Sequence, residues 1–224
     1  MSDARAASGR AARLAAARLY LVTGAEPAHG DLPDLLRAAA AGGVDVVQLR
    51  EKDLPDEDLA SVAHAARILC DVLGVVFVVN DRPHVALEVG AHGVHVGQED
   101  MPPERVRELV GEQMLIGLST HAPGEVAAAD PSLIDYIGVG PVHETPTKPG
   151  RPAVGTELVR YAAAHARLPF FAIGGLDAGN VGEVLDAGAS RVCVLRAISD
   201  AEDPRAAAAE LVAAIEGGAD GGRP

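Results

Sequence analysis

The stretch Val44–Asp53, with the sequence VDVVQLREKD, sets the interpretation of the whole chain. It begins as a short, β-branched apolar run directly after Gly42–Gly43 and ends in charged residues. A short apolar run bounded by glycine indicates a buried β-strand. Gln48, Arg50 and Lys52 follow at alternate positions, so they share one face for as long as the strand continues. Two cations and an amide at a strand end suit a phosphorylated ligand, although a solvated strand end fits the same pattern.

Seven more short apolar runs occur along the chain, and a stretch typical of a helix follows each run. The second predicted strand lies within the stretch 44–53, and the other seven are 18–23, 75–79, 93–96, 114–118, 134–139, 169–173 and 191–195. They read as continuous apolar runs, which is typical of a parallel sheet that is covered by helices. Eight such units in 224 residues predict a single α/β domain with the (β/α)8 TIM-barrel fold. An open doubly wound sheet is the second choice, because no GxGxxG motif follows the first strand.

The expected catalytic domain covers residues 18–216. Residues 1–17 are rich in Ala and Arg and are expected to be a helical or disordered lead-in, and residues 217–224 a flexible tail. The lead-in lacks the apolar segment of a secretory signal, and no run reaches the roughly 20 apolar residues that span a bilayer. Cys70 and Cys193 are expected to be small buried hydrophobic residues and not a disulfide or metal pair, which favours a cytoplasmic protein.

The formal net charge of −13 argues against binding to nucleic acid or to anionic membranes. The cations at the strand ends make small phosphorylated molecules the expected partners, and the sequence leaves both a monomer and a homo-oligomer open. Only two of the 19 basic residues are lysines, Lys52 and Lys148, and both lie at or just after predicted strand ends.

In a TIM barrel the carboxyl ends of the strands meet on one face, and the loops that leave them form the site. Polar residues concentrate at these predicted ends, namely Gln48, Arg50, Lys52, Asn80, Asp81, Asp100, Ser119, the loop Glu144–Pro149 and Arg196. His92 and His95 have a spacing seen in metal sites, but residues three apart on a strand face opposite sides. These two histidines are therefore interpreted as packing or supporting residues.

Asp81 and Asp100 follow neighbouring strands, whose axes would lie about 4.8 Å apart. Two carboxylates at that separation repel each other unless a cation lies between them. Mg²⁺ fits this position, because it is usually bound by one or two carboxylates together with substrate phosphates. The alternative is that Asp81 and Asp100 are N-caps of the helices expected at Pro83 and Pro102.

Phosphate binding is expected at the loops after the seventh and eighth strands. Gly174–Gly175 allows close approach of the main chain, and Arg196 adds a cation. The longest loop, Gly140–Pro152, is stiffened by Pro146 and Pro149 and carries Lys148.

These motifs together resemble thiamine-phosphate synthase, a (β/α)8 enzyme family. The resemblance runs from about residue 18 to about residue 198, and its motifs are QLREK (48–52), NDR (80–82), GQED (97–100), ST (119–120), YIGVGP (136–141), TPTK (145–148) and IGG (173–175). It implies a Mg²⁺-dependent transferase that condenses 4-amino-5-hydroxymethyl-2-methylpyrimidine diphosphate with hydroxyethylthiazole phosphate. The products are thiamine phosphate and diphosphate.

The resemblance also implies roles for individual residues. Those expected to bind the pyrimidine diphosphate are Gln48, Arg50, Lys52, Asn80, Ser119 and Lys148, with Arg50, Lys52, Ser119 and Lys148 as the catalytic group. Those expected to bind the thiazole phosphate are Thr145, Thr147, Gly175 and the main chain at Leu195–Arg196. Leu49, Glu51 and Pro146 are counted as substrate-binding with their motifs, and Asp81 and Asp100 as the Mg²⁺ ligands. Arg196 departs from the family, in which many members have Ser.

The cations and the absence of an evident general base favour a dissociative path, in which diphosphate leaves before the thiazole nitrogen attacks. Two other functions stay open at this point. A thiazole tautomerase uses a similar scaffold but would not need the paired aspartates or Lys52 and Lys148. A barrel that binds a phosphorylated ligand without catalysis is the other.

Overall fold

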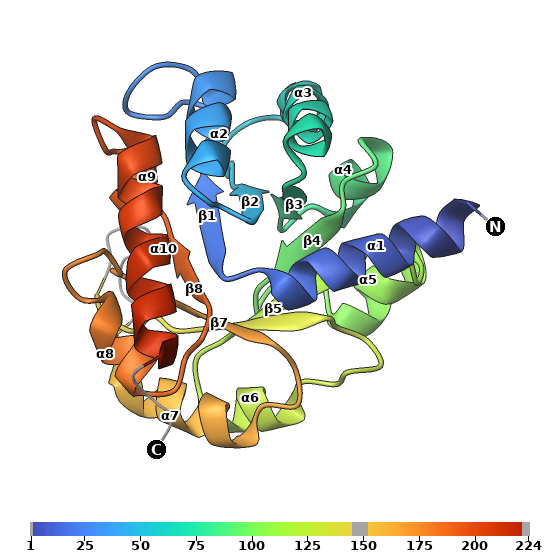
Figure 1. The fold of residues 1–224 in the computed structure, drawn as a ribbon. Helices are drawn as coiled ribbons and strands as arrows, with labels where there is room; N and C mark the ends of the chain where they lie inside the picture. The colour runs from blue at the N-terminus through green and yellow to red at the C-terminus, as the bar shows by residue number, and fades with distance from the viewer. Residues whose placement is uncertain (1, 145–151, 221–224) are drawn as a thin grey trace.

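The computed structural model describes residues 2–144 and 152–220, and the side chains of residues 9–144 and 152–218 (Figure 1). Within these residues eight parallel strands form a closed barrel in chain order, and β8 pairs with β1. The strands are β1 (Leu19–Thr23), β2 (Val46–Leu49), β3 (Val76–Asn80), β4 (Gly93–Val96), β5 (Leu115–Thr120), β6 (Tyr136–Val139), β7 (Phe170–Ile173) and β8 (Val192–Val194). The predicted TIM barrel is confirmed, and the open doubly wound sheet is excluded.

Helices surround the barrel in Figure 1 and follow the strands in turn. They are α2 (Leu32–Ala41), α3 (Asp56–Leu73), α4 (Pro83–Glu88), α5 (Pro103–Val110), α6 (Pro123–Ala128), α7 (Gly155–His165), α8 (Val181–Asp186), α9 (Arg196–Ser199) and α10 (Pro204–Asp220). The local sequence explains where these helices begin and end. In α2, for example, Asp31 caps the first turn by accepting from the amide of Asp34, and Gly42 ends the helix.

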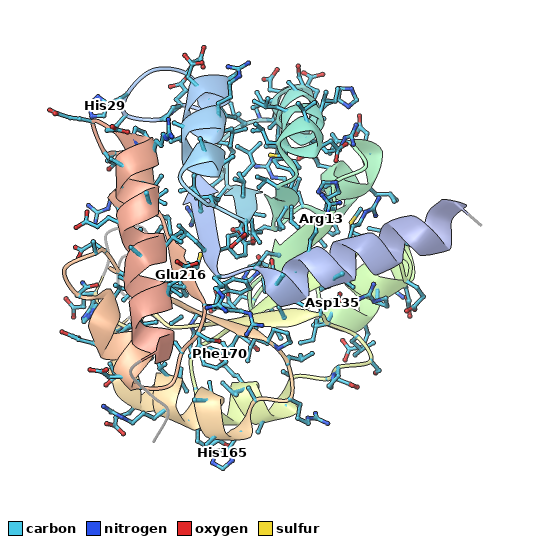
Figure 2. All side chains as sticks on the ribbon, viewed as in Figure 1. Arg13, His29, Asp135, His165, Phe170 and Glu216 are labelled. Atoms are coloured by element: carbon cyan, nitrogen blue, oxygen red, sulfur yellow. The ribbon has the colours of Figure 1, made fainter. Side chains whose placement is uncertain are left out.

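Two helical features differ from the sequence interpretation. The four-residue helix α9 begins immediately after β8 and was not expected, and α10 continues to Asp220, beyond the boundary at 216. Residues 2–16 form a helix, α1 (Ser2–Ala16), which crosses one end of the barrel (Figure 1). Figure 2 is viewed from this end and labels Arg13 on α1, and Asp135 in the connection before β6.

The core has two layers, because alternate residues of each strand face opposite sides. The outer layer lies between strands and helices and includes Leu19, Leu21 and Phe77. The inner layer fills the barrel and contains Tyr20, Tyr136, Phe171 and Cys193, together with Leu14 and Ala17 from the end of α1. Helix α1 therefore closes the barrel at the amino ends of the strands, and the carboxyl ends remain for a site.

Two other predictions concern the described residues. Cys70 and Cys193 are both buried, and neither forms a disulfide within the described residues, as expected. No helix in the described part of the chain is both long enough and apolar enough to cross a membrane.

Candidate functional site

A cavity of about 370 Å³ opens at the carboxyl ends of the strands. All eight strands, or the residues directly after them, contribute to its wall. Of the residues predicted from sequence, the wall contains Gln48, Arg50, Asn80, Ser119, Gly175, Leu195 and Arg196. The structure thus brings together side chains that are up to about 150 positions apart in the sequence.

The QLREK motif divides between two sides of β2. Gln48 and Arg50 face the cavity, whereas Leu49 is buried in the outer layer against the helices. Glu51 reaches sideways, and its Oε1 accepts a hydrogen bond from the main-chain amide of Ala25 at 2.5 Å. The side chains of Leu49 and Glu51 therefore support the loops around the cavity and do not line it.

Asp81 and Asp100 lie next to each other, although each follows a different strand. Burial is the main cause that raises the pKa of the Asp81 carboxyl, and contact with the carboxyl of Asp100 raises that pKa further. The positive charge of Lys52 and a hydrogen bond from Asn80 act in the opposite direction. Two carboxyl groups that face each other beside one lysine can leave this site with a net negative charge.

The N-cap alternative for these aspartates does not match the structure. Helix α4 starts after Arg82 and α5 starts after Pro102, and neither helix has a side-chain cap. The Asp100 carboxylate accepts from the amide of Gly97 at 2.7 Å, so it is held by its own loop. Among the described residues no group of three or more His, Cys, Asp or Glu side chains gathers as a metal site. A cation at Asp81 and Asp100 would therefore need further ligands from substrate or water.

A chain of buried hydrogen bonds crosses the floor of the cavity. Gln48 donates to the hydroxyl of Tyr20 at 2.7 Å, and the Tyr20 and Tyr136 hydroxyl oxygens lie 2.9 Å apart. The Tyr136 hydroxyl lies 3.3 Å from Nδ1 of His95, whose Nε2 lies 3.0 Å from Oγ of Ser119. Burial raises the pKa of both tyrosines, so both stay protonated and can donate. The chain links Gln48 to Ser119 through residues that the sequence analysis did not place in the site.

A small residue in β5 makes this arrangement fit. A Cβ atom at Gly117 would collide with the rings of Tyr136 and His95. A glycine inside an apolar strand is a known sign of close approach, and this signal could have pointed to the cavity floor. His92, in contrast, lies outside the cavity wall, and its two ring nitrogens contact the Phe77 amide at 2.9 Å and Asp71 at 2.7 Å. The two histidines thus face opposite sides, as expected.

The loops after β6, β7 and β8 form the other side of the cavity. Gly174 and Gly175 have φ of 115° and 63°, which side-chain-bearing residues rarely adopt. The amides of Val142 and His143 donate to the carbonyls of Ile173 and Gly174 at 2.9 and 3.0 Å. These bonds place the start of the long loop beside the glycine pair. Thr145, Pro146, Thr147 and Lys148 lie outside the described residues.

Helix α9 completes this side of the cavity. Leu195 and Arg196, at its start, line the wall, as do Gly174 and Gly175. Loops after the seventh and eighth strands, with the start of a short extra helix, are a frequent phosphate site in this fold. Gly174–Gly175 after β7 and Leu195–Arg196 at the start of α9 have this arrangement.

Comparisons with known proteins agree with this geometry. The family described as thiamine monophosphate synthase matches residues 19–198. The chain is 51% identical to the thiamine-phosphate synthase of Thermobifida fusca, over 89% of this chain and 92% of that protein. It is 50% identical to that of Mycobacterium leprae, over 91% and 92%. The solved thiamine phosphate pyrophosphorylase from Pyrococcus furiosus superposes with a TM-score of 0.81 at 32% identity, over 90% of this chain and 96% of that one.

Proposed function

Because this chain belongs to the thiamine monophosphate synthase family, we propose that the cavity at the strand ends is its catalytic centre. The chain is a transferase that condenses 4-amino-5-hydroxymethyl-2-methylpyrimidine diphosphate with hydroxyethylthiazole phosphate, releasing diphosphate and giving thiamine phosphate. The proposal concerns which residues perform this reaction and which cation assists it.

The pyrimidine diphosphate is assigned to the side of the cavity made by β2, β3 and β5. Arg50 and Lys52 supply two cations for the diphosphate, and Lys148 supplies a third from the long loop. Gln48, Asn80 and Ser119 supply neutral hydrogen-bonding groups, and all three line the cavity. This division suits a substrate with an uncharged ring and a charged tail.

Mg²⁺ is the proposed metal, with Asp81 and Asp100 as its protein ligands. The donor set fits, because the half-buried carboxyl of Asp81 faces the exposed carboxyl of Asp100, and such a pair favours a hard divalent cation between the two groups. Bound Mg²⁺ would supply charge neutralisation for the departing diphosphate. The protein's own part is to hold the two carboxylates together and to keep Lys52 beside them.

The thiazole phosphate is assigned to the opposite side of the cavity. Gly175 and the main chain at Leu195–Arg196 would bind its phosphate, with Thr145 and Thr147 from the long loop. Because Arg196 is the first residue of α9, its amide is available without regard to side-chain identity, which accounts for Arg in place of Ser. Anchoring the phosphate positions the thiazole nitrogen as the nucleophile.

No protein nucleophile is needed for this reaction. Arg50, Lys52 and Lys148 stabilise negative charge as it develops on the leaving diphosphate. We therefore propose a dissociative path in which the pyrimidine methylene carbon gains positive charge. Electron-withdrawing substituents on the pyrimidine should slow such a path, and an unchanged rate would contradict it.

The observation that carries the site assignment is the meeting of Asp81, Asp100 and Lys52 directly beside the cavity residue Asn80. A tautomerase or a non-catalytic binder would not need this group. Incubation with both substrates, with and without Mg²⁺, tests the assignment, since only the proposed enzyme makes thiamine phosphate and depends on the metal. The two buried cysteines, which form no disulfide within the described residues, support a cytoplasmic location, and the net charge of −13 supports a lack of nucleic-acid partners.

A further inference from the structure

Arg82 lies between the proposed metal ligand and helix α4, but its side chain turns towards a different loop. The guanidinium group donates to the carbonyl oxygen of Lys52 at 2.8 Å and to that of Leu54 at 2.6 Å. It also forms an ion pair with Asp56 at 2.9 Å. The Arg82 side chain is only 19% exposed, although its partner Asp56 is 56% exposed. One residue therefore holds the segment 52–56 at three points.

The main chain at Arg82 forms a tight turn around Asp81. Its amide donates to the carbonyl of Asn80 at 2.8 Å, and Asp81 between them has a φ of 61°. This is the pattern of a γ-turn with a positive central φ, which is strained for a residue other than glycine. Such a conformation persists only where its surroundings impose it. The amide of Asp81 is also fixed, because it donates to the carbonyl of His95 at 2.8 Å.

The loop that carries Lys52 has few other anchors of its own. Residues 50–55 have no helix or strand structure, and the chain becomes helical only at Asp56. Before Lys52, the Arg50 amide donates to the carbonyl of Thr23 at 2.9 Å and Glu51 accepts from the amide of Ala25. After Lys52, the half-buried Leu54 packs against the core, and the polar contacts are those of Arg82. Lys52 is exposed, so packing does not hold its backbone in place.

We propose that Arg82 is a positioning residue for catalysis, because it holds the Lys52 loop against the turn that presents Asp81. This inference rests on the proposed function, in which Lys52 and Asp81 act on the same magnesium-bound diphosphate. A planar guanidinium can serve two carbonyls and a carboxylate at once, whereas the ammonium of a lysine is a compact point charge without that fixed fork. Arg82 thus sets the spacing between a cation and an anion that are about 30 residues apart in the sequence.

The test compares Arg82→Met and Arg82→Lys with the control Arg105→Met. Arg105 is 70% exposed on α5 and pairs only locally with Glu108. Calorimetry measures the binding of Mg²⁺ with inorganic diphosphate to each purified protein, and steady-state kinetics gives KM for each substrate. Far-ultraviolet circular dichroism and thermal unfolding show that each variant is folded.

We expect Arg82→Met to weaken Mg²⁺–diphosphate binding and to raise KM for the pyrimidine diphosphate by roughly 10- to 100-fold, as for other residues that orient a metal ligand. KM for the thiazole phosphate stays at the wild-type value, Arg82→Lys is intermediate, and Arg105→Met is unchanged. If Arg82→Met does not fold, the same comparison is made with Arg82→Lys, and its result tests the proposed role of Arg82.

Two results would overturn the inference. One is wild-type binding and wild-type KM in the folded Arg82 variant, and the other is equal loss of affinity for both substrates, which indicates general damage. A wild-type protein that makes thiamine phosphate without binding Mg²⁺–diphosphate is a different result. It overturns the proposed metal site, and the inference with it.

Discussion

Nε2 of His95 lies 3.0 Å from Oγ of Ser119, and this contact joins β4 to β5 at the floor of the cavity. It is the last link of the hydrogen-bonded chain that begins at Gln48 and passes through Tyr20 and Tyr136. Because Gln48 and Ser119 are both assigned to the pyrimidine diphosphate, the buried chain fixes two groups that contact one substrate. We infer that the residues between them, Tyr20, Tyr136 and His95, orient these two groups.

Tyr136→Phe tests the buried chain. The substitution removes the hydroxyl between Tyr20 and His95 and keeps the ring, whose centroid lies 5.8 Å from that of Phe171. A lost hydrogen bond with a buried partner left unsatisfied costs on the order of 1–2 kcal/mol, so kcat/KM for the pyrimidine diphosphate should fall about tenfold. Steady-state kinetics measures the change. Tyr161→Phe on α7, outside the cavity wall, is the matched control, and equal activity of the two variants would argue against an orienting chain.

Asp81→Asn is expected to raise the stability of the metal-free protein at pH 7 and to lower its activity. The folded state raises the pKa of Asp81, so it binds the proton more tightly than the unfolded chain does. The stability that Asp81 contributes is therefore present below its unfolded pKa of about 3.9 and is lost as the pH rises through the folded value. At pH 7 without metal the variant should melt at a higher temperature than the wild type, and this advantage should shrink as the pH falls towards 4.

Activity of Asp81→Asn should fall on the order of 100-fold or more, since a bound metal supplies several kcal/mol of charge stabilisation. Asp130→Asn provides a control of opposite sign. A hydrogen bond from the Ser132 amide lowers the pKa of Asp130, so this variant should melt at a lower temperature at pH 7 and keep full activity. Full activity of Asp81→Asn, or a loss of stability at pH 7, would contradict the account of the acidic pair.

Gly117→Ala tests the packing of the cavity floor. The added Cβ would collide with Tyr136 and His95, and such overpacking typically costs about 1–3 kcal/mol of unfolding free energy. Urea unfolding followed by circular dichroism measures this cost. Gly182→Ala in α8 is the control, because nothing lies within 4 Å of its new Cβ, and it should stabilise the protein by about 0.5–1 kcal/mol. If both variants unfold alike, the close contact at Gly117 does not limit the fold.

Arg196→Ser tests whether the thiazole phosphate is bound through the main chain. The change introduces the residue that the family resemblance leads us to expect at the start of α9, and it leaves the amide in place. We expect KM for the thiazole phosphate to be unchanged. A clear decrease in that KM would show that the hydroxyl contributes to binding and that Arg196 weakens it. A clear increase would show that the guanidinium takes part.

The barrel could be predicted from sequence because each strand is a short apolar run between turn or helix signals. These apolar runs do not indicate which residues face the inside of the barrel, since both faces of a barrel strand are buried. Tyr20, Tyr136 and His95 were not placed in the cavity for this reason. Helix α9 was missed because four residues carry no periodic pattern.

The QLREK motif shows that adjacent residues of one sequence motif can have different structural roles. Alternation along β2 puts Gln48 and Arg50 in the cavity and Leu49 against the helices, so the two-residue period located the wall residues better than the whole motif did. Lys52 lies beyond the end of β2, and alternation no longer determines its direction. Its position beside Asp81 depends on tertiary contacts, above all those of Arg82.

The most direct test of the central claim is a crystal structure of the protein with Mn²⁺ in place of Mg²⁺ and with diphosphate, using anomalous diffraction to locate the metal. We expect an anomalous peak between the carboxylates of Asp81 and Asp100, next to a diphosphate that Arg50 and Lys52 contact. A metal bound elsewhere, or a diphosphate bound away from these four residues, would contradict it.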